Sequence, residues 1–198
     1  MLQLETYYHI FNHGNGDDNL FREEKNYDFF LKKYHQHIDP IADTVAWCLM
    51  KNHFHLLVKI KSGEEVAPTF PKFETLEKLE NQSNFISKRF ANFFSSYTQA
   101  FNKVYKRRGS LFLKNFRRKE IPEDGYLRIL IRYIHLNPIK HGFTNNLLEW
   151  EYSSYDTFTS NQSKLTTILF GDEANYRFVH QQSLHNFSEY ERLENELT

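Results

Sequence analysis

Two histidines separated by one residue lie in an apolar stretch at residues 53–58 (HFHLLV). Alternate side chains of a β-strand point to the same face, so His53 and His55 would share one face and the apolar residues between and after them the other. Imidazole is the commonest protein ligand for metals, and such a pair can bind one ion from a rigid platform. The pattern alone equally allows two partly exposed histidines on an amphipathic strand.

A tyrosine and an asparagine four residues apart, Tyr133 and Asn137, would lie one turn apart on one face of a helix. A phenol can attack a phosphodiester as a covalent nucleophile, and an amide oxygen can complete a metal site. Taken alone, the residues favour a plainer interpretation, in which Tyr133 packs in the core beside Tyr126 and Ile129. Asn137 would then only cap the helix before Pro138.

Four further histidines are weaker candidates. His35 and His37 have the same spacing as the pair, but they lie in a segment predicted to be helical, where positions two apart do not face each other. They are predicted to lie on a solvated surface. His9 and His13 could face the sheet near the pair, although a lone histidine there is more often satisfied by a hydrogen bond.

Positive charge is concentrated between residues 103 and 119, where aromatic residues are interleaved with basic ones and no acidic residue occurs. Such a stretch is typical of a surface that binds a phosphate backbone and stacks bases, with a solvated charged surface as the alternative. Because salt screens charges beyond about 8 to 10 Å, this local field matters more than the formal net charge of zero. The predicted DNA-binding residues are Lys103, Lys106, Arg107, Arg108, Lys114, Arg117, Arg118 and Lys119.

The 198 residues suffice for one domain with a hydrophobic core. We expect that domain at residues 1–156, followed at 157–198 by an acidic extension packed on or flanking it. The single cysteine, Cys48, excludes an internal disulfide and a cysteine-based zinc cluster, and it lies in an apolar run that predicts a buried position. No apolar run approaches the ~18 residues of a membrane span, so a cytoplasmic protein without a membrane partner is expected.

The elements that must position these residues follow from periodicity and turn signals. In chain order they are a strand, a helix, a two-stranded hairpin, a loop, a long helix, an extended segment and a last helix that ends before Pro138. Their predicted ranges are 6–12, 21–38, 44–50 with 53–60, 61–72, 86–105, 111–120 and 122–137. The order predicts an α+β fold with helices packed on an antiparallel sheet.

Several motifs resemble those of IS200-like transposases, in particular the branch of REP-associated tyrosine transposases. Residues 47–55 (WCLMKNHFH) resemble the signature CLMPNHxHLLV of that family, and residues 132–142 (RYIHLNPIKHG) are similar to RYIHLNPVKAG. Shorter matches occur in the same order at 8–14 (YHIFNHG), 101–102 (FN), 108–112 (RGSLF), 150 (W) and 152–155 (YSSY). The resemblance covers about residues 6 to 156.

This resemblance implies a ferredoxin-like sheet, the HUH endonuclease fold, in which His53, His55 and Asn137 hold Mg²⁺ or Mn²⁺. Tyr133 would attack single-stranded, hairpin-containing DNA, leaving a 5′-phosphotyrosine link and a 3′-hydroxyl that can later rejoin strands. Insertion-sequence relatives carry Gln where this chain has the shorter Asn137, and Lys51 occupies the usual proline position of the hairpin turn. The resemblance implies a monomer or a homodimer.

Two other functions remain open at this point. The histidine pair could serve a metal-dependent phosphodiesterase that uses water, or the chain could be a domesticated nucleic-acid-binding module with little or no catalysis. A histidine-triad hydrolase is disfavoured because Leu57 stands where a third histidine is needed.

Overall fold

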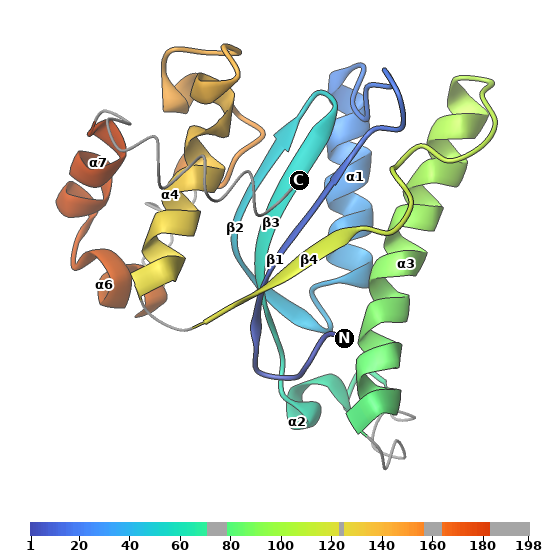
Figure 1. Ribbon diagram of the computed structural model, residues 1–198, viewed down its shortest axis with the longest axis horizontal. Coiled ribbons are helices and arrows are strands. Elements are labelled where there is room, and N and C mark those ends of the chain that lie inside the picture. Colours follow the sequence, from blue (N-terminus) through green and yellow to red (C-terminus); the bar gives the residue numbers. More distant parts are fainter. Residues whose placement is uncertain (71–78, 123–124, 157–163, 183–198) are drawn as a thin grey trace.

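A four-stranded antiparallel sheet, with strand order β2-β3-β1-β4, forms the centre of the computed structural model (Figure 1). The structure describes residues 1–70, 79–122, 125–156 and 164–182. With two helices placed after β1 and β3, this order is the ferredoxin-like arrangement, which confirms the predicted fold. The elements are β1 (Tyr7–His13), α1 (Glu24–His37), β2 (Ala42–Met50), β3 (His53–Ile60), α2 (Gly63–Val66), α3 (Leu79–Val104), β4 (Arg117–Ile121), α4 (Gly125–Lys140), the short η2 (Leu147–Glu149), α6 (Lys164–Phe170) and α7 (Glu173–Gln181).

Both faces of the sheet are covered by helices. Helices α1 and α3 lie on one face, whereas α4 lies on the other, between the sheet and α6 and α7 (Figure 1). The alternation along β3 divides its side chains as predicted, because Phe54, Leu56 and Val58 join the core under α1 and α3. Leu57 and the buried Cys48 belong to the second core, under α4.

The pairing register of β1, β2 and β3 determines which side chains of the sheet lie under α4. The predicted hairpin is present, with Met50 opposite His53 across the turn of Lys51 and Asn52. On the other side of β3, β1 pairs so that His13 lies opposite His53 and Phe11 lies opposite His55. Facing residues of an antiparallel pair point to the same side, so residues of β1 join the histidine face.

The segment predicted as a loop, residues 61–72, contains the short helix α2. The prediction overlooked a capping box: the Ser62 hydroxyl accepts from the backbone N–H of Glu65, and the Glu65 carboxylate accepts from the backbone N–H of Ser62. Two orphan donors are thereby satisfied, which supports a helical turn despite the prolines further along. Residues 71 and 72 lie outside the described part of the chain.

The predicted end of the last helix before Pro138 is wrong, since α4 continues to Lys140. Proline costs a helix one hydrogen bond, and in the last turn that loss is tolerated because few bonds follow. The helix instead closes at Gly142, whose φ of +69° suits glycine. Its N–H donates to Ile139 O at 3.0 Å while that of Phe143 donates to Pro138 O at 2.9 Å, which is a Schellman motif.

Helices α6 and α7 pack against α4. Helix α6 ends in three apolar residues, 168–170, and α7 buries Tyr176 and His180. The predicted boundary at 156 stays a prediction, because residues 157–163 and 183–198 lie outside the described part. Within that part, the structure contains no helix with the length and apolar character needed to cross a membrane.

Candidate active site

The histidine pair of β3 lies under helix α4, almost completely buried. His53 and His55 are 3% and 4% exposed, and their rings meet edge to face with centroids 5.2 Å apart. Nδ1 of His53 lies 2.8 Å from Oδ1 of the adjacent Asn52. An amide oxygen can only accept, so Nδ1 of His53 carries the proton and Nε2 keeps a lone pair.

One face of α4 brings its polar residues to this pair. The ring of Tyr133 meets that of His55 edge on, with centroids 5.4 Å apart, and His141 approaches His53 in the same way at 5.0 Å. Asn137 lies between them, because residues four apart on a helix share a face. The structure therefore brings together the four residues predicted for catalysis and metal binding, Tyr133, His53, His55 and Asn137, within one chain.

Asn137 offers a buried oxygen to this space. Its Nδ2 donates to Tyr133 O at 2.9 Å, whereas Oδ1 is buried and has no hydrogen bond of good geometry. The amide lies close enough to His53 to favour protonation of that ring weakly. Buried carbonyl oxygens without partners are costly in a native protein, so this atom fits a role as a ligand for a cation.

The donor set suits a divalent metal that also takes ligands from outside the protein. In the described ranges, no group of three or more His, Cys, Asp or Glu side chains is arranged to hold an ion. A metal would rest on two imidazoles and one amide oxygen, leaving its other positions to water or to a bound phosphate.

Burial keeps the histidines of the site neutral. Desolvation lowers the pKa of His53 to about 3, with smaller contributions from the positive forms of His13 and His141. The pKa of His55 is also well below its usual range, chiefly because of burial. A neutral imidazole is the form that binds metals, so both rings are competent ligands at neutral pH without losing a proton first.

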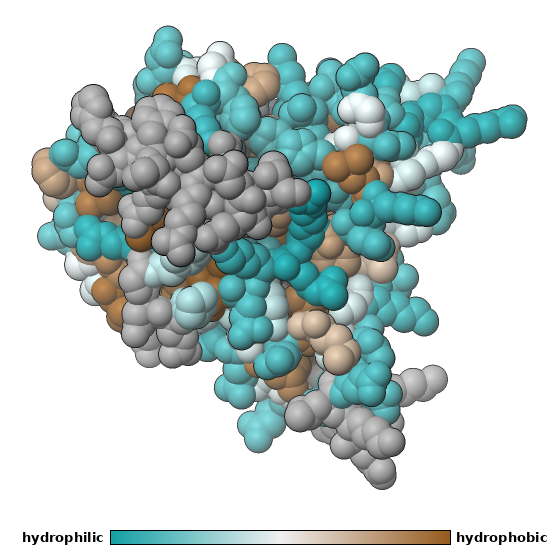
Figure 2. Space-filling model, viewed as in Figure 1, coloured by the Kyte–Doolittle hydropathy of each residue, from teal (hydrophilic) through white to brown (hydrophobic). Residues whose placement is uncertain are grey.

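Strand β4 adds positive charge to the same face of the sheet. Lys119 lies opposite His9 and Arg117 opposite Phe11, so both point to the histidine side. Arg118 points to the other side, with its guanidinium 5.6 Å from the ring of Phe116. In Figure 2 strongly hydrophilic side chains cover the region of β4, which lies at the front of that view. Alternation thus separates the predicted basic residues of β4 into two groups.

The remaining basic residues are distributed around the end of α3. Arg107 is held by an ion pair with Asp18 and donates to Asn102 Oδ1 at 2.7 Å, so its guanidinium fixes the turn after α3. The side chain of Asn102 also donates to Gly109 O at 2.9 Å, which gives that part of the sequence motif a structural role. The other predicted DNA-binding residues of this region are exposed, namely Lys103, Lys106, Arg108 and Lys114.

Three further histidines lie at the site, and two of them had only been weak candidates. His9 is fully buried beside His55, and the ring of His13 stacks on that of His53 with centroids 4.6 Å apart. His9 and His13 are an even number of residues apart in a predicted strand and therefore share one face, so their spacing could have predicted this position. His141, directly after α4, was not predicted as a site residue, because the helix was predicted to end before Pro138.

The other histidine pair, on α1, lies on the opposite side of the sheet. His35 is exposed, and its Nδ1 lies 2.9 Å from an oxygen of Asp39. His37 approaches Phe93 of α3. Neither contacts the predicted site, but the predicted solvated surface is correct only for His35, because His37 is half-buried with its Nδ1 inside the protein.

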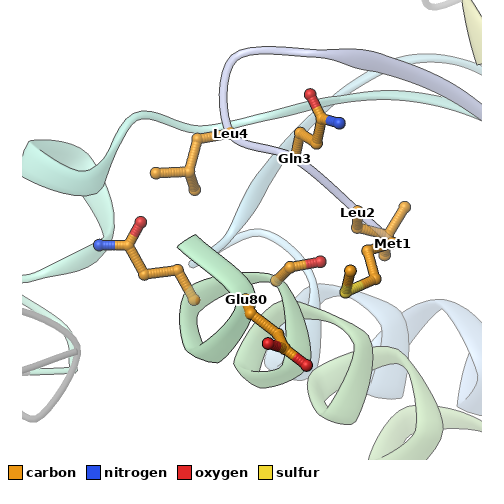
Figure 3. Close-up of a pocket in the computed structure, with 7 residues that line it drawn as sticks. Met1, Leu2, Gln3, Leu4 and Glu80 are labelled. Atoms are coloured by element: carbon orange, nitrogen blue, oxygen red, sulfur yellow. The ribbon is translucent and has the colours of Figure 1, made fainter. Parts of the chain in front are cut away.

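A cavity lies far from these residues, between the N-terminal segment and the start of α3 (Figure 3). It has a volume of about 330 Å³ and is lined by Met1, Leu2, Gln3, Leu4, Glu80, Gln82 and Ser83. None of the predicted site residues lines it.

Known proteins resemble this chain in sequence and in fold. No protein-family model matches it. A curated protein of Haemophilus influenzae named as a REP-associated tyrosine transposase is 24% identical over 116 residues, which cover 57% of this chain and 58% of that protein. A solved structure of a REP-associated tyrosine transposase bound to a REP hairpin has a TM-score of 0.60 with this chain, at 17% identity, covering 81% of this chain and 82% of that one.

The chain is similar to REP-associated tyrosine transposases in sequence and in fold. The solved REP-associated tyrosine transposase shares its fold, and the curated one shares sequence over less than two thirds of its own length. These comparisons show a shared fold and a partial likeness in sequence. The roles of individual residues depend on the geometry of the site.

Proposed function

We propose that this chain cleaves and rejoins single-stranded DNA through a covalent 5′-phosphotyrosine link formed by Tyr133, with Mg²⁺ or Mn²⁺ at the histidine pair. The observation that carries the proposal is the contact between Tyr133 of α4 and His55 of β3, whose ring centroids are 5.4 Å apart. A tyrosine that only filled the core would need no histidine pair or unpaired amide oxygen beside it. One copy of the chain supplies all of these groups, which favours a monomer.

Three side chains would hold the metal. They are His53 and His55, through their neutral rings, and Asn137 through the buried Oδ1 that lacks a hydrogen bond. When bound, the ion supplies Lewis-acid chemistry by polarising the scissile phosphate. Asn137 also ties the metal site to the nucleophile, because its Nδ2 bonds the backbone carbonyl of Tyr133.

The nucleophile would act by exchanging one phosphodiester bond for another. The phenol oxygen of Tyr133 attacks phosphorus and loses its proton, the bond from phosphorus to the 3′ oxygen breaks, and that oxygen takes up a proton to become a hydroxyl. Reversal by the same or another 3′-hydroxyl restores the DNA backbone and frees the tyrosine. The bond energy stays in the phosphotyrosine link, so strand joining needs no nucleotide cofactor.

Positive side chains around Tyr133 would guide the DNA to it. Arg117 and Lys119 flank the histidines from β4, and Nζ of Lys140 lies 5.7 Å from the centre of the Tyr133 ring. Such charges attract a phosphate backbone without reading its sequence. The solved neighbour was bound to a REP hairpin, which supports hairpin-containing DNA as the substrate.

The proposal is tested by trapping the covalent link. The protein is incubated with labelled single-stranded hairpin DNA and Mn²⁺, and an adduct that resists SDS is expected. Tyr133→Phe should abolish the adduct while keeping the ring in the core. Tyr126→Phe is the matched control, because Tyr126 lies on the same helix and the substitution likewise removes only a hydroxyl from the ring.

Each result of this experiment points to one function. An adduct that persists in Tyr133→Phe would mean that the nucleophile is misassigned. Metal-dependent cleavage without an adduct would favour a phosphodiesterase that uses water. Binding of the hairpin without cleavage would favour a nucleic-acid-binding module.

A further inference from the structure

The buried side chain of His9 contacts the ring of His55 directly. Their rings are stacked with centroids 5.1 Å apart, and Nε2 of His9 lies 3.0 Å from Nδ1 of His55. Two ring nitrogens at this distance share one proton, so one of them donates and the other accepts.

The position of that proton decides whether His55 can bind a metal. When Nδ1 of His55 carries it, Nε2 of His55 keeps a lone pair for the ion. When Nε2 of His9 carries it, the single proton of the neutral His55 ring must be on Nε2, and that nitrogen is blocked. Histidines that bind metals almost always donate their other N–H to a neighbouring acceptor.

We infer that His9 is a positioning residue whose Nε2 accepts the Nδ1–H of His55 and thereby directs Nε2 of His55 towards the metal, an inference that rests on the proposed function. The corresponding acceptor for His53 is the amide oxygen of Asn52. Asn52 is the adjacent residue and its oxygen can only accept, so the His53 tautomer is settled locally. His9 is 46 residues from His55 along the chain, and its ring can either accept or donate.

The surroundings of Nδ1 of His9 affect the free energies of both proton arrangements. Nδ1 of His9 is buried without a hydrogen-bond partner. In the metal-binding arrangement it carries the proton of His9, and a buried N–H without a partner is costly. In the opposite arrangement it has only an unpaired lone pair, while both Nε2 atoms carry the protons. Each ring keeps one proton throughout, and metal binding would draw the two rings into the first arrangement together.

Two substitutions of His9 separate acceptor chemistry from packing. His9→Phe keeps an aromatic ring but removes the acceptor, and it should weaken Mn²⁺ binding about 10 to 100-fold, the range found for such supporting contacts. His9→Gln can place an amide oxygen near the position of Nε2, so it should bind Mn²⁺ almost as tightly as the wild type. His35→Gln on the exposed face of α1 controls for loss of a histidine. Binding is measured on the full chain by the EPR signal of free Mn²⁺, with circular dichroism to verify folding.

A second measurement reads the tautomer itself. Long-range ¹H–¹⁵N NMR of histidine-labelled wild-type protein with Mg²⁺ should show the His55 proton on Nδ1. Finding it on Nε2, or finding equal Mn²⁺ affinity in folded His9→Phe and wild type, would overturn the role of His9 and leave the proposed function intact. If the wild type itself bound no Mn²⁺ with or without DNA, both the role of His9 and the metal of the proposed function would be wrong.

Discussion

Helix α4 separates two groups of buried histidines that have opposite hydrogen-bonding character. On its sheet side lie His9, His53 and His55, and on the side of α7 lie His135 and His180. In both groups burial lowers the pKa of the rings, to about 3 for His53 and about 4 for His180. Burial and neutrality alone therefore do not distinguish a ligand from a structural histidine.

The group beside α7 is closed by hydrogen bonds. His180 donates from Nδ1 to Tyr176 O at 2.8 Å, which leaves its Nε2 to accept from His135 Nδ1 at 3.2 Å. Nε2 of His135 accepts in turn from the Ser154 hydroxyl at 2.8 Å. Ser154 and Tyr155 anchor this network to the chain, because Ser154 Oγ accepts from Trp47 N–H and the Tyr155 carbonyl accepts from the Tyr176 hydroxyl.

The group on the sheet side of α4 is open, in the sense that some of its buried polar atoms have no hydrogen bond. Nδ1 of His9 and Oδ1 of Asn137 are both buried without hydrogen bonds, next to a tyrosine and to positive charge from β4. A network in which every ring nitrogen has a partner stabilises the fold. A cluster with unused lone pairs instead offers ligands to something outside the protein. The group beside α7 therefore has a structural role, whereas the group on the sheet side of α4 is the one suited to chemistry.

The largest expected effect is on catalysis at the open group. His55→Ala should reduce DNA cleavage about a thousand-fold, because Lewis-acid stabilisation is worth several kcal/mol and would be lost with the metal. The initial rate of cleavage with Mn²⁺ and the Mn²⁺ affinity measure this. His135→Ala serves as the counterpart and should retain Mn²⁺ binding. If His135→Ala lost metal binding and His55→Ala kept it, the assignment of the two groups would be reversed.

The next effect is on stability at the closed group. His135→Ala should lower the free energy of unfolding by about 3 kcal/mol, because it opens a cavity and removes the histidine partner of the Ser154 hydroxyl and of His180 Nε2. Urea denaturation followed by circular dichroism gives this value. His35→Ala, on the exposed surface of α1, should change stability by less than about 0.5 kcal/mol. Equal stability of the two variants would contradict the structural role of the network.

A smaller effect concerns pH. The pKa of His180 is lowered from 6.5 to about 4, so the unfolded chain takes up a proton below pH 6.5 that the folded protein resists. Stability from this group is fully present above pH 6.5 and is lost as the pH falls towards 4. Between pH 7.5 and 5 the loss should be about 2 kcal/mol, at 1.36 kcal/mol per pKa unit.

His180→Gln isolates this contribution from those of other groups. The variant should be less stable at pH 7.5 and should lose less stability than the wild type when the pH is lowered to 5. Unfolding free energies at the two pH values give the difference. Identical losses in both proteins would show that His180 is protonated in the folded state or exposed there.

The smallest expected effect is on DNA binding by the positive charge beside the open group. Replacing Arg117 and Lys119 together by Gln should weaken hairpin DNA binding about fivefold and reduce the salt dependence of binding by about two phosphate contacts. Arg118→Gln, on the other face of β4, is the control and should leave both unchanged. Fluorescence anisotropy at several salt concentrations measures this. Equal losses in both variants would mean that the DNA follows another path.

Much of the candidate site could be predicted from the family motifs, and periodicity within single elements explains the geometry of those motifs. The alternation of a strand puts His53 and His55 on one face, and the helical repeat does the same for Tyr133 and Asn137. The order of strands and helices was also sufficient for an antiparallel α+β fold. These relations hold between neighbours in the chain, whatever the rest of the molecule does.

Only the tertiary structure decided which faces meet. The pairing of β1 with β3 brings His9 to His55, and the pairing of β1 with β4 selects Arg117 and Lys119 from a continuous basic stretch. The packing of α7 on α4 gives Nδ1 of His135 a partner, whereas Asn137 Oδ1 makes no hydrogen bond of good geometry. Periodicity orients a side chain relative to its own element, but contacts between distant elements depend on how the hydrophobic faces pack. The sequence by itself therefore identified the candidate ligands and nucleophile, and the fold distinguished the open histidines from the closed ones.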